Sequence, residues 1–437
     1  MHGPAEPFAL LDDCTATPGQ PCSRLYTGFV REHRCENAAT LDALWQDVQR
    51  DQQAGLHAVV LADYEWGLAL VGLPPRPPAS AEQQATSPAL RVLMFARLHH
   101  LSRDEVDAWL ASPPGFTAAH GGAPRLSPLT PTLGPQAYAR AIARIHDAIR
   151  AGETYQVNHT HRLRGELTGS PLALYRLLRA RQPVPYGALI ALPHAPGRPA
   201  WVLSCSPELF IEQNQGTLTA RPMKGTAPRS ADPSVDQAQA HWLRHDAKNR
   251  AENLMIVDLL RNDLGRVAQT GTVKVPELFA VAPHGAVWQM TSTITARLRE
   301  HLSFPDLLRA SFPCGSITGA PKRHTMQLIQ QLEDTPRGLY TGSIGWVDAT
   351  GPDADSWACC LSVAIRTVCV SAPDAEGRHA IEMGVGSGIV LDSEAESEYA
   401  ECQLKARFLT GVVEAAPLDT APDTPWNAPL PAAACAV

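Results

Sequence analysis

Lysine is scarce in this chain. Only five of its 37 lysine and arginine residues are lysines, at positions 224, 248, 274, 322 and 405. Arginine therefore supplies most of the positive charge, and a position that keeps lysine is a candidate for chemistry that arginine cannot do. A lysine amine can lose its proton and act as a nucleophile, whereas a guanidinium stays protonated. Lys224, in the stretch RPMKGTAPRS, has two open interpretations: a nucleophile, or a surface lysine in a turn.

Long apolar segments and runs of basic residues are also missing. The longest apolar stretch, HAVVLADYEWGLALVGL, is interrupted by Asp63 and Glu65, so it is not a membrane-spanning helix. The first residues, MHGPAEPFALLDD, lack the basic start of a signal peptide. A formal net charge of −7 without a basic run argues against nucleic acid or an anionic membrane as partner. We expect a cytoplasmic protein that acts on small molecules or binds proteins.

The ten cysteines contain no C-x-x-C pair, and several stand in apolar runs. This pattern is typical of buried reduced thiols rather than of a disulfide framework or a zinc site. Cys314 has no histidine at a recognisable spacing, so a buried thiol is favoured there over a nucleophile. His159 and His161 would share one face of a strand, and without a third ligand both are interpreted as structural.

With 437 residues, the chain has the length of one large domain or two. A Pro/Gly-rich connection at 111–135 separates an N-terminal portion (1–130, connection included), packed on the main body, from a catalytic domain (131–412). An Ala/Pro-rich tail (413–437) is expected to be mobile. Helical and strand patterns interleave without a βαβ period, which favours an α+β fold.

Two segments predict amphipathic helices. Their apolar side chains stand at the spacing of one helical face: Leu41, Leu44, Trp45 and Val48 in the first, and Tyr138, Ile142, Ile145 and Ile149 in the second. Gly152 is expected to end the second helix, and a strand to begin near Tyr155.

Acidic residues on two further predicted helices suggest a cation site. Ser393 and Glu396 have the spacing of a capping box at the start of a helix, on which Glu398 and Glu401 lie one turn apart. The other helix carries Glu252 ahead of the apolar series Met255, Leu259 and Leu260. Carboxylates from two helices suit Mg²⁺, but glutamates that face solvent are the commoner case, and spacing alone leaves both interpretations open.

Seven motifs follow one another in a fixed order from about residue 135 to 412. They read YQVN, SPELF, PMKGT, AENLMIVDLLRNDLGRV, GSITGAPK, AIRT and GSGIVLDS followed by SEYAECQLKA. The series resembles the chorismate-utilising enzymes, and an ordered series is far more specific than any one motif. The resemblance implies an α+β fold with two large antiparallel sheets packed as a sandwich, flanking helices and a deep cleft.

The same resemblance implies roles for individual residues. Glu252 and Glu401 would bind Mg²⁺ directly, and Glu398 would bind it through a water molecule. Glu208 would be the general acid that protonates the departing C4 hydroxyl. Arg366 would pair with a carboxylate of chorismate. Further residues would line the substrate pocket: Gly225, Thr226, Gly386, Gly388 and Lys405.

Two positions separate branches of the family. Branches that add water carry a lysine where this chain has Gln156, so the resemblance favours an ammonia-using branch. Lys224 matches the aminodeoxychorismate synthase branch, whereas anthranilate synthases have alanine there. The implied reaction is attack by Lys224 on chorismate, followed by ammonia, to leave a C4 amino group for 4-aminobenzoate and folate synthesis. An anthranilate synthase and a non-catalytic chorismate-binding protein are the alternatives.

Some features depart from the family pattern. Trp288 and Gln289 stand where many members have histidine, and Trp346 replaces a common tyrosine. The chain shows no glutamine amidotransferase signature. Ammonia is therefore expected from a separate amidotransferase subunit or from solution.

Overall fold

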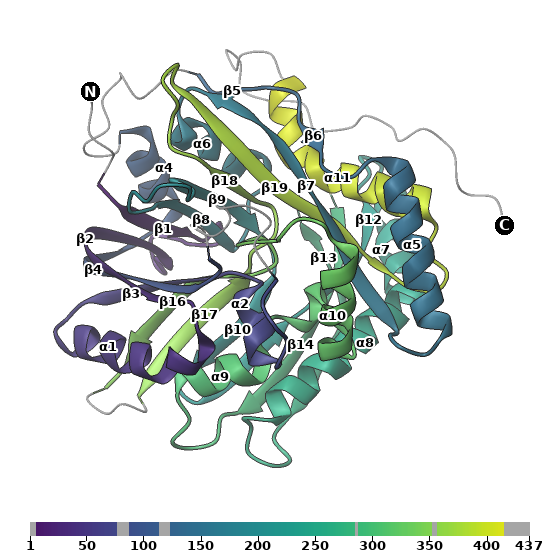
Figure 1. The fold of residues 1–437 in the computed structure, drawn as a ribbon, viewed down its shortest axis with the longest axis horizontal. Helices are drawn as coiled ribbons and strands as arrows, with labels where there is room; N and C mark the ends of the chain where they lie inside the picture. The colour runs from purple at the N-terminus through teal and green to yellow at the C-terminus, as the bar shows by residue number, and fades with distance from the viewer. Residues whose placement is uncertain (1–5, 77–86, 113–122, 285–286, 352–355, 415–437) are drawn as a thin grey trace.

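The computed structural model describes residues 6–76, 87–112, 123–284, 287–351 and 356–414. Within these residues every strand pairing is antiparallel, and the pairings join the strands into one network. Figure 1 shows the network with helices around it. The expected α+β class with extensive antiparallel sheet is confirmed.

The strands pair in an order very different from their order in the sequence. At one end β14 (Val287–Arg297) pairs with β13 (Lys274–His284), β12 (Met223–Pro228) and β11 (Thr217–Arg221). From β11 the pairing continues through β10 (Leu209–Asn214), β17 (Trp357–Val363), β16 (Ser343–Ala349), β3 (His57–Ala62), β4 (Leu90–Leu101), β2 (Ser23–Cys35), β1 (Phe8–Asp12), β8 (Tyr186–Ala191), β9 (Trp201–Ser206), β18 (Thr367–Val370), β19 (Arg378–Ile389) and β7 (Gln156–Thr168). Three short strands pair with β7: β5 (Arg125–Leu126), β6 (Thr130–Pro131) and β15 (Gly319–Ala320).

The network curls until two of its parts share a core. Ala9, Ile190 and Val202, from β1, β8 and β9, belong to one hydrophobic cluster with Val59 of β3 and Ile344 of β16. The expected packed layers are therefore parts of one continuous sheet.

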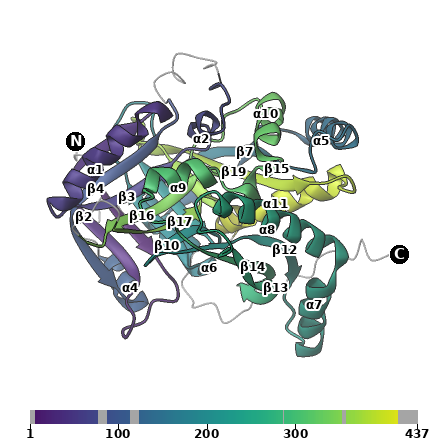
Figure 2. The ribbon, with the colours of Figure 1, turned by 90° about the horizontal axis from the view of Figure 1, so that it is seen from below.

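Helices cover the outside of this sheet. They are α1 (Leu41–Gln53), α2 (Trp66–Leu70), α4 (Arg103–Ala111), α5 (Pro135–Arg150), α6 (Pro171–Arg181), α7 (Pro233–His245), α8 (Ala247–Gly265), α9 (Phe304–Ser311), α10 (Lys322–Leu332) and α11 (Ala395–Glu414), with short turns η1 (Ala38–Thr40) and η3 (Gly315–Ile317). Figures 1 and 2 both place α1 at one end of the molecule and α5 with α11 at the other. Helices α7 and α8 pack on β12 and β14.

Both amphipathic helices are present. Helix α1 buries all four predicted residues, and α5 buries Tyr138, Ile142 and Ile145, with Ile149 half-buried. Gly152 follows α5 with φ +76°, and β7 begins at Gln156, one residue after the predicted strand start.

The helix predicted to start at Ser393 is present as α11, but its predicted capping box was wrong. The helix begins at Ala395, and the Ser393 hydroxyl accepts the Val390 backbone N–H at 3.1 Å. The serine therefore closes the preceding turn instead of capping the helix, because a serine hydroxyl bonds whichever nearby backbone group the chain presents.

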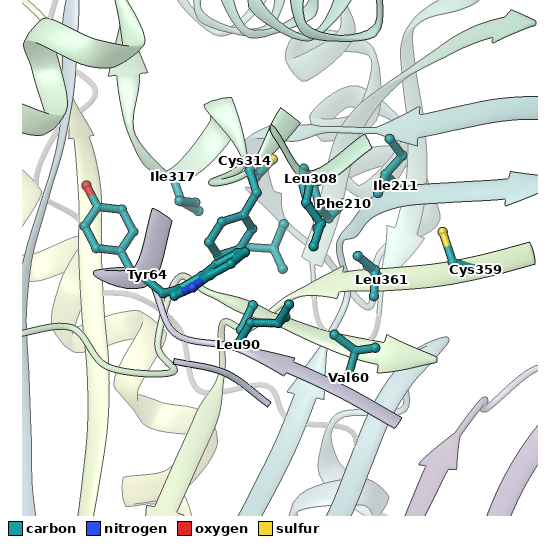
Figure 3. Packing of buried hydrophobic residues seen from close by; sticks show 14 of the residues in the cluster. Val60, Tyr64, Leu90, Phe210, Ile211, Leu308, Cys314, Ile317, Cys359 and Leu361 are labelled. Atoms are coloured by element: carbon teal, nitrogen blue, oxygen red, sulfur yellow. The ribbon is translucent and has the colours of Figure 1, made fainter. Parts of the chain in front are cut away.

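The core near η3 is apolar and contains thiols. Figure 3 shows Phe210, Leu308, Cys314 and Ile317 among its packed side chains. Burial raises the pKa of Cys314 to about 12, which confirms the buried-thiol interpretation. All nine cysteines in the described residues are free, as predicted, and Cys435 lies outside those residues.

The N-terminal strands are joined to strands of the main body, since β1 pairs with β8 and β3 with β16. The division of the chain at 130/131 stays a prediction. Residues 113–122 of the Pro/Gly-rich connection and 415–437 of the tail lie outside the described residues. In the described part of the chain, no helix has the length and apolar composition needed to cross a bilayer.

Candidate active site

A bulge in β12 shapes the segment that carries Lys224. Met223 pairs with Thr291 of β14 and Thr226 pairs with Gln289, so three steps along β12 match two along β14. The extra residue falls at Lys224 and Gly225, where Gly225 has φ +90°. Within the described residues the half-buried Lys224 amine has no hydrogen bond or ion-pair partner.

The Lys224 amine and Gln156 converge on Gly388 of β19. A Cβ atom placed on Gly388 would stand 2.9 Å from Lys224 Nζ and 2.6 Å from Gln156 Nε2. Gln156 is fully buried, and neither polar atom of its side chain has a hydrogen-bond partner in the part of the chain that the structure describes. Buried polar groups without partners are rare, so this point is a candidate place for a polar ligand.

Glu208 lies in the link between β9 and β10 and is 4% exposed. Burial raises the pKa of its carboxyl, which a hydrogen bond from Ser316 and attraction to Lys224 oppose only in part. Among the described residues its Oε1 has no hydrogen-bond partner. A buried carboxyl with a raised pKa near an amine is suited to give up a proton during a reaction.

Arg366 lies between β17 and β18 with φ +50°, and its carbonyl accepts the Cys205 backbone N–H at 2.9 Å. Burial lowers the pKa of its guanidinium, while Cys205 and Glu208 act to raise it. In the described part of the chain the guanidinium has no ion-pair partner. A ligand carboxylate would supply one.

Three carboxylates from two helices interact with one another. Burial raises the pKa of Glu252 on α8; Lys224 and Lys248 lower it, and Glu398 and Glu401 on α11 raise it further. Among the described residues no group of three or more His, Cys, Asp or Glu side chains forms a ready metal cluster. A cation would relieve the repulsion, and carboxylate oxygens are donors that Mg²⁺ prefers, so the donor chemistry fits Mg²⁺ with other ligands from substrate and water.

Lys405 ties α11 to the glycine-containing part of β19. Its Nζ lies 2.7 Å from Glu401 Oε1 and donates to the Gly386 carbonyl at 2.8 Å. Burial acts to raise the pKa of Glu401, but the pair with Lys405 lowers it. A Cβ on Gly386 would stand 2.6 Å from the His159 carbonyl, so a side chain there would collide with β7.

The remaining predicted positions contribute differently. Thr226 is exposed on β12. Trp288 donates to Asp236 Oδ1 at 3.0 Å, whereas Gln289 donates to the Gly225 carbonyl at 3.1 Å. The Trp346 ring lies under a guanidinium, with Arg24 Cζ 4.0 Å from its centroid.

Sequence reasoning missed Ser316 and Lys248. Ser316 lies in GSITGAPK, a motif that entered only as one member of the ordered series, yet its hydroxyl bonds Glu208. Lys248 stands four residues before Glu252 and acts on the pKa of both Glu252 and Glu401. The scarcity of lysine was the signal that could have identified it.

A separate cavity of about 110 Å³ lies beside α6 and contains none of the predicted site residues. Three of its charged groups pair with one another, since Arg179 contacts both Asp12 and Asp107. The Tyr175 hydroxyl also donates to Asp12, at 3.0 Å. The predicted chemistry therefore does not reside in this cavity.

Comparison with known families shows to which family the chain belongs. The profile of the chorismate binding enzymes matches residues 11–411. The chain belongs to this family. The resemblance inferred from the seven motifs is confirmed.

This chorismate binding enzyme has several similar relatives. The aminodeoxychorismate synthase component 1 of Klebsiella aerogenes is 45% identical over 264 residues, which are 60% of this chain and 55% of that protein. The anthranilate synthase component 1 of Streptomyces coelicolor is 38% identical over 287 residues, 66% and 53% of the two chains. Anthranilate synthase component I from Streptococcus pneumoniae has a similar crystal structure, with a TM-score of 0.66, 26% identity, and coverage of 93% and 90%. The chain spans about half the length of the curated relatives it matches.

Proposed function

We propose that this chorismate binding enzyme is an aminodeoxychorismate synthase component I, which converts chorismate and ammonia to 4-amino-4-deoxychorismate for 4-aminobenzoate and folate synthesis. The observation that carries the proposal is that Lys224 and Gln156 meet beside Gly388. Glu208 lies close enough for the Lys224 charge to act on the pKa of its carboxyl. The site offers an amine without a partner, a carboxyl with a raised pKa and a neutral amide. This set suits amination through a covalent lysine intermediate.

The proposed reaction has two displacements. The neutral Lys224 amine supplies the electron pair for a new C–N bond to the chorismate ring, while the C4–O bond breaks and the hydroxyl leaves as water with the Glu208 proton. Ammonia then forms the C4–N bond, and Lys224 leaves as a neutral amine. The new ammonium gives one proton back to Glu208, so chorismate and ammonia yield the amino product and water.

Other residues of the site hold the substrate in this proposal. Arg366 pairs with a chorismate carboxylate, and Gln156 orients the incoming nitrogen through its unpartnered amide. The absence of a side chain at Gly388 leaves room for the ring, and Gly386, Thr226, Gly225 and the Lys405 stem complete the walls.

Glu252 and Glu401 are proposed to hold Mg²⁺, with Glu398 contributing through water. When bound, the ion neutralises a substrate carboxylate and holds it against the two helices. Chelator should abolish turnover, and Glu401→Ala should do the same while the protein stays folded. Full activity in excess chelator would refute the metal site.

A glutamine amidotransferase subunit is proposed as the source of ammonia in the cell, where we expect a cytoplasmic location. The isolated chain should use ammonium salts at raised pH and use glutamine poorly. Efficient use of glutamine by this chain alone would contradict the need for a partner.

The deciding experiment incubates the protein with chorismate, Mg²⁺ and an ammonium salt and identifies the product by mass. 4-Amino-4-deoxychorismate is expected. Fluorescent anthranilate with released pyruvate would instead support an anthranilate synthase, the activity named for the 38% identical relative. Binding of chorismate without any product would support a non-catalytic binding protein.

Lys224→Arg tests the covalent step. Arginine keeps the charge but cannot supply a neutral amine near neutral pH, so amination should be lost while chorismate still binds through Mg²⁺ and Arg366. Wild-type protein quenched with chorismate without ammonia should carry an adduct on the Lys224 peptide. An active arginine variant, with no adduct in either protein, would return Lys224 to a structural role.

A further inference from the structure

The bulge that carries Lys224 is held on two sides. On one side Gln289 Nε2 donates to the Gly225 carbonyl at 3.1 Å. On the other, a Cβ on Gly225 would stand 2.9 Å from Asn249 Oδ1. Asn249 is itself fixed, since its Nδ2 donates to Asp246 Oδ2 at 2.8 Å. Gly225, the residue after Lys224, therefore has a hydrogen bond at its carbonyl and Asn249 packed against its α-carbon.

Gln289 is well placed to fix this bulge. It is 8% exposed and pairs through β14 with Thr226, directly after the irregularity. Among the described residues, its bond is the one side-chain hydrogen bond to the backbone of Lys224 or Gly225. The adjacent Trp288 points to the opposite face of β14, because successive side chains of a strand alternate.

We propose that Gln289 is a positioning residue, whose hydrogen bond to the Gly225 carbonyl keeps the bulge in the conformation that aims the Lys224 amine at the point beside Gly388 and Gln156. The inference rests on the proposed role of Lys224 as the nucleophile. Backbone rotation at Gly225, which glycine permits readily, would swing that amine away. A displacement of about 1 Å at a reacting group costs up to about 100-fold in rate.

The test compares Gln289→Met with Trp288→Phe. Methionine keeps the length and volume of glutamine but has no N–H to donate, whereas the Trp288 variant loses the bond to Asp236 on the other face of the same strand. Each protein is mixed with chorismate without ammonia, and the Lys224 adduct is timed by mass spectrometry. Chorismate affinity is measured by calorimetry.

Gln289→Met should slow both adduct formation and amination by about tenfold or more, with chorismate affinity changed by less than about threefold. Trp288→Phe should stay within about threefold of wild type in all three measurements. Gln289→His, which restores an N–H donor, should recover part of the lost rate. An adduct rate of Gln289→Met within about twofold of wild type would overturn the proposal.

Two further measurements cover the cases in which Gln289→Met does not fold or the wild type forms no adduct. If Gln289→Met does not fold, Gln289→Asn is used, because its amide is one methylene too short to bond Gly225 and the same slowing is expected. If wild type forms no adduct, the covalent function fails. Labelling with acetic anhydride then tests position alone: Gln289→Met should change the labelling of Lys224 relative to exposed Lys274 by more than about twofold, and an unchanged ratio would overturn the proposal.

Discussion

Glu208 and Glu333 are buried to almost the same extent, 4% and 5% exposed, yet their carboxyls are shifted in opposite directions. Burial raises the pKa of Glu208. Burial acts in the same direction on Glu333, but Arg337 and Arg162 outweigh it and lower the pKa. The number and charge of the partners therefore decide which buried carboxyl keeps its proton.

The partners of Glu333 also show what it is for. Its carboxylate accepts hydrogen bonds from the Thr160 backbone at 2.9 Å and from Arg337 Nη2 at 2.7 Å. Arg337 in turn donates to the carbonyls of Ile317 at 2.9 Å and Asn158 at 2.6 Å. This network joins η3, which carries Ser316, to the start of β7. The Glu333 carboxylate therefore has a structural role, whereas Glu208 Oε1 has no hydrogen-bond partner among the described residues.

The largest effect on activity is expected from Glu208→Gln, which tests the contrast between Glu208 and Glu333. An amide keeps the shape of the side chain but has no acidic proton, so amination should fall by about 10²–10⁴-fold. The free energy of unfolding should change by less than about 1 kcal/mol, since the amide keeps one oxygen to accept from Ser316 and Oε1 has no partner among the described residues. Product formation measures the loss of amination, and urea denaturation measures the free energy of unfolding. Retained activity would show that Glu208 is not the general acid.

The opposite outcome is expected for Glu333→Gln. Removing one charge from a fully buried ion pair leaves Arg337 and Arg162 uncompensated, which should lower the free energy of unfolding by about 3–5 kcal/mol. The shift of the urea midpoint measures it. A variant as stable as wild type would break the contrast, because partners would then not be what distinguishes the two glutamates.

His161 extends the comparison to a buried base. Burial lowers its pKa from 6.5 to about 4, with help from His159 and Arg162. As pH falls, His161 is protonated in the unfolded chain before it is protonated in the folded protein. Its neutral form therefore costs no stability above about pH 6.5, whereas the free energy of unfolding falls by up to about 3 kcal/mol between pH 6.5 and pH 4. His161→Phe, which keeps a ring against Tyr399, should remove this part of the pH dependence.

Denaturation series between pH 7 and pH 4.5 isolate His161 from Glu333. The pKa of Glu333 is lowered, so its contribution is lost only as pH falls below the usual glutamate range. His159, whose pKa burial also lowers, should leave the variant with a residual slope. A wild-type slope in His161→Phe would contradict the assignment.

The smallest effect on stability is expected for an exposed carboxylate with a single ion-pair partner. Arg164 Nε lies 2.7 Å from Glu382 Oε2 at the surface, with both side chains more than a third exposed. Glu382→Gln should change the free energy of unfolding by less than about 1 kcal/mol. A loss as large as that of Glu333→Gln would mean that burial is not what makes the Arg337 pair costly to break.

Local patterns in the sequence were enough to place some helices. The buried faces of α1 and α5 follow from side chains three or four residues apart, which interact within the helix itself. The apolar series on α8 is less regular: Leu260 is fully buried, whereas Met255 and Leu259 are half-buried. This helix packs against strands, α7, α9 and η3, so its burial depends on tertiary neighbours.

The site was beyond local patterns. Lys224, Glu208 and Gln156 meet only because β7, the β9–β10 link and β12 converge in the folded sheet, and the family resemblance was what named them in advance. Gln289 stood out in the sequence only as a departure from the family pattern. Its bond to Gly225 depends on the register of a bulge, which residue spacing does not reveal.

The pairing of β3 has a consequence for how the protein is made. One edge of β3 pairs with β4, which follows it closely, but the other pairs with β16, which begins only at Ser343. At about 5–20 residues per second, translation takes on the order of tens of seconds to reach that partner. Throughout this interval an edge rich in apolar side chains, including Val59 and Leu61, is open to pairing with other nascent chains. We expect the yield of folded enzyme to depend on chaperones and on the speed at which the segment between β3 and β16 is synthesised.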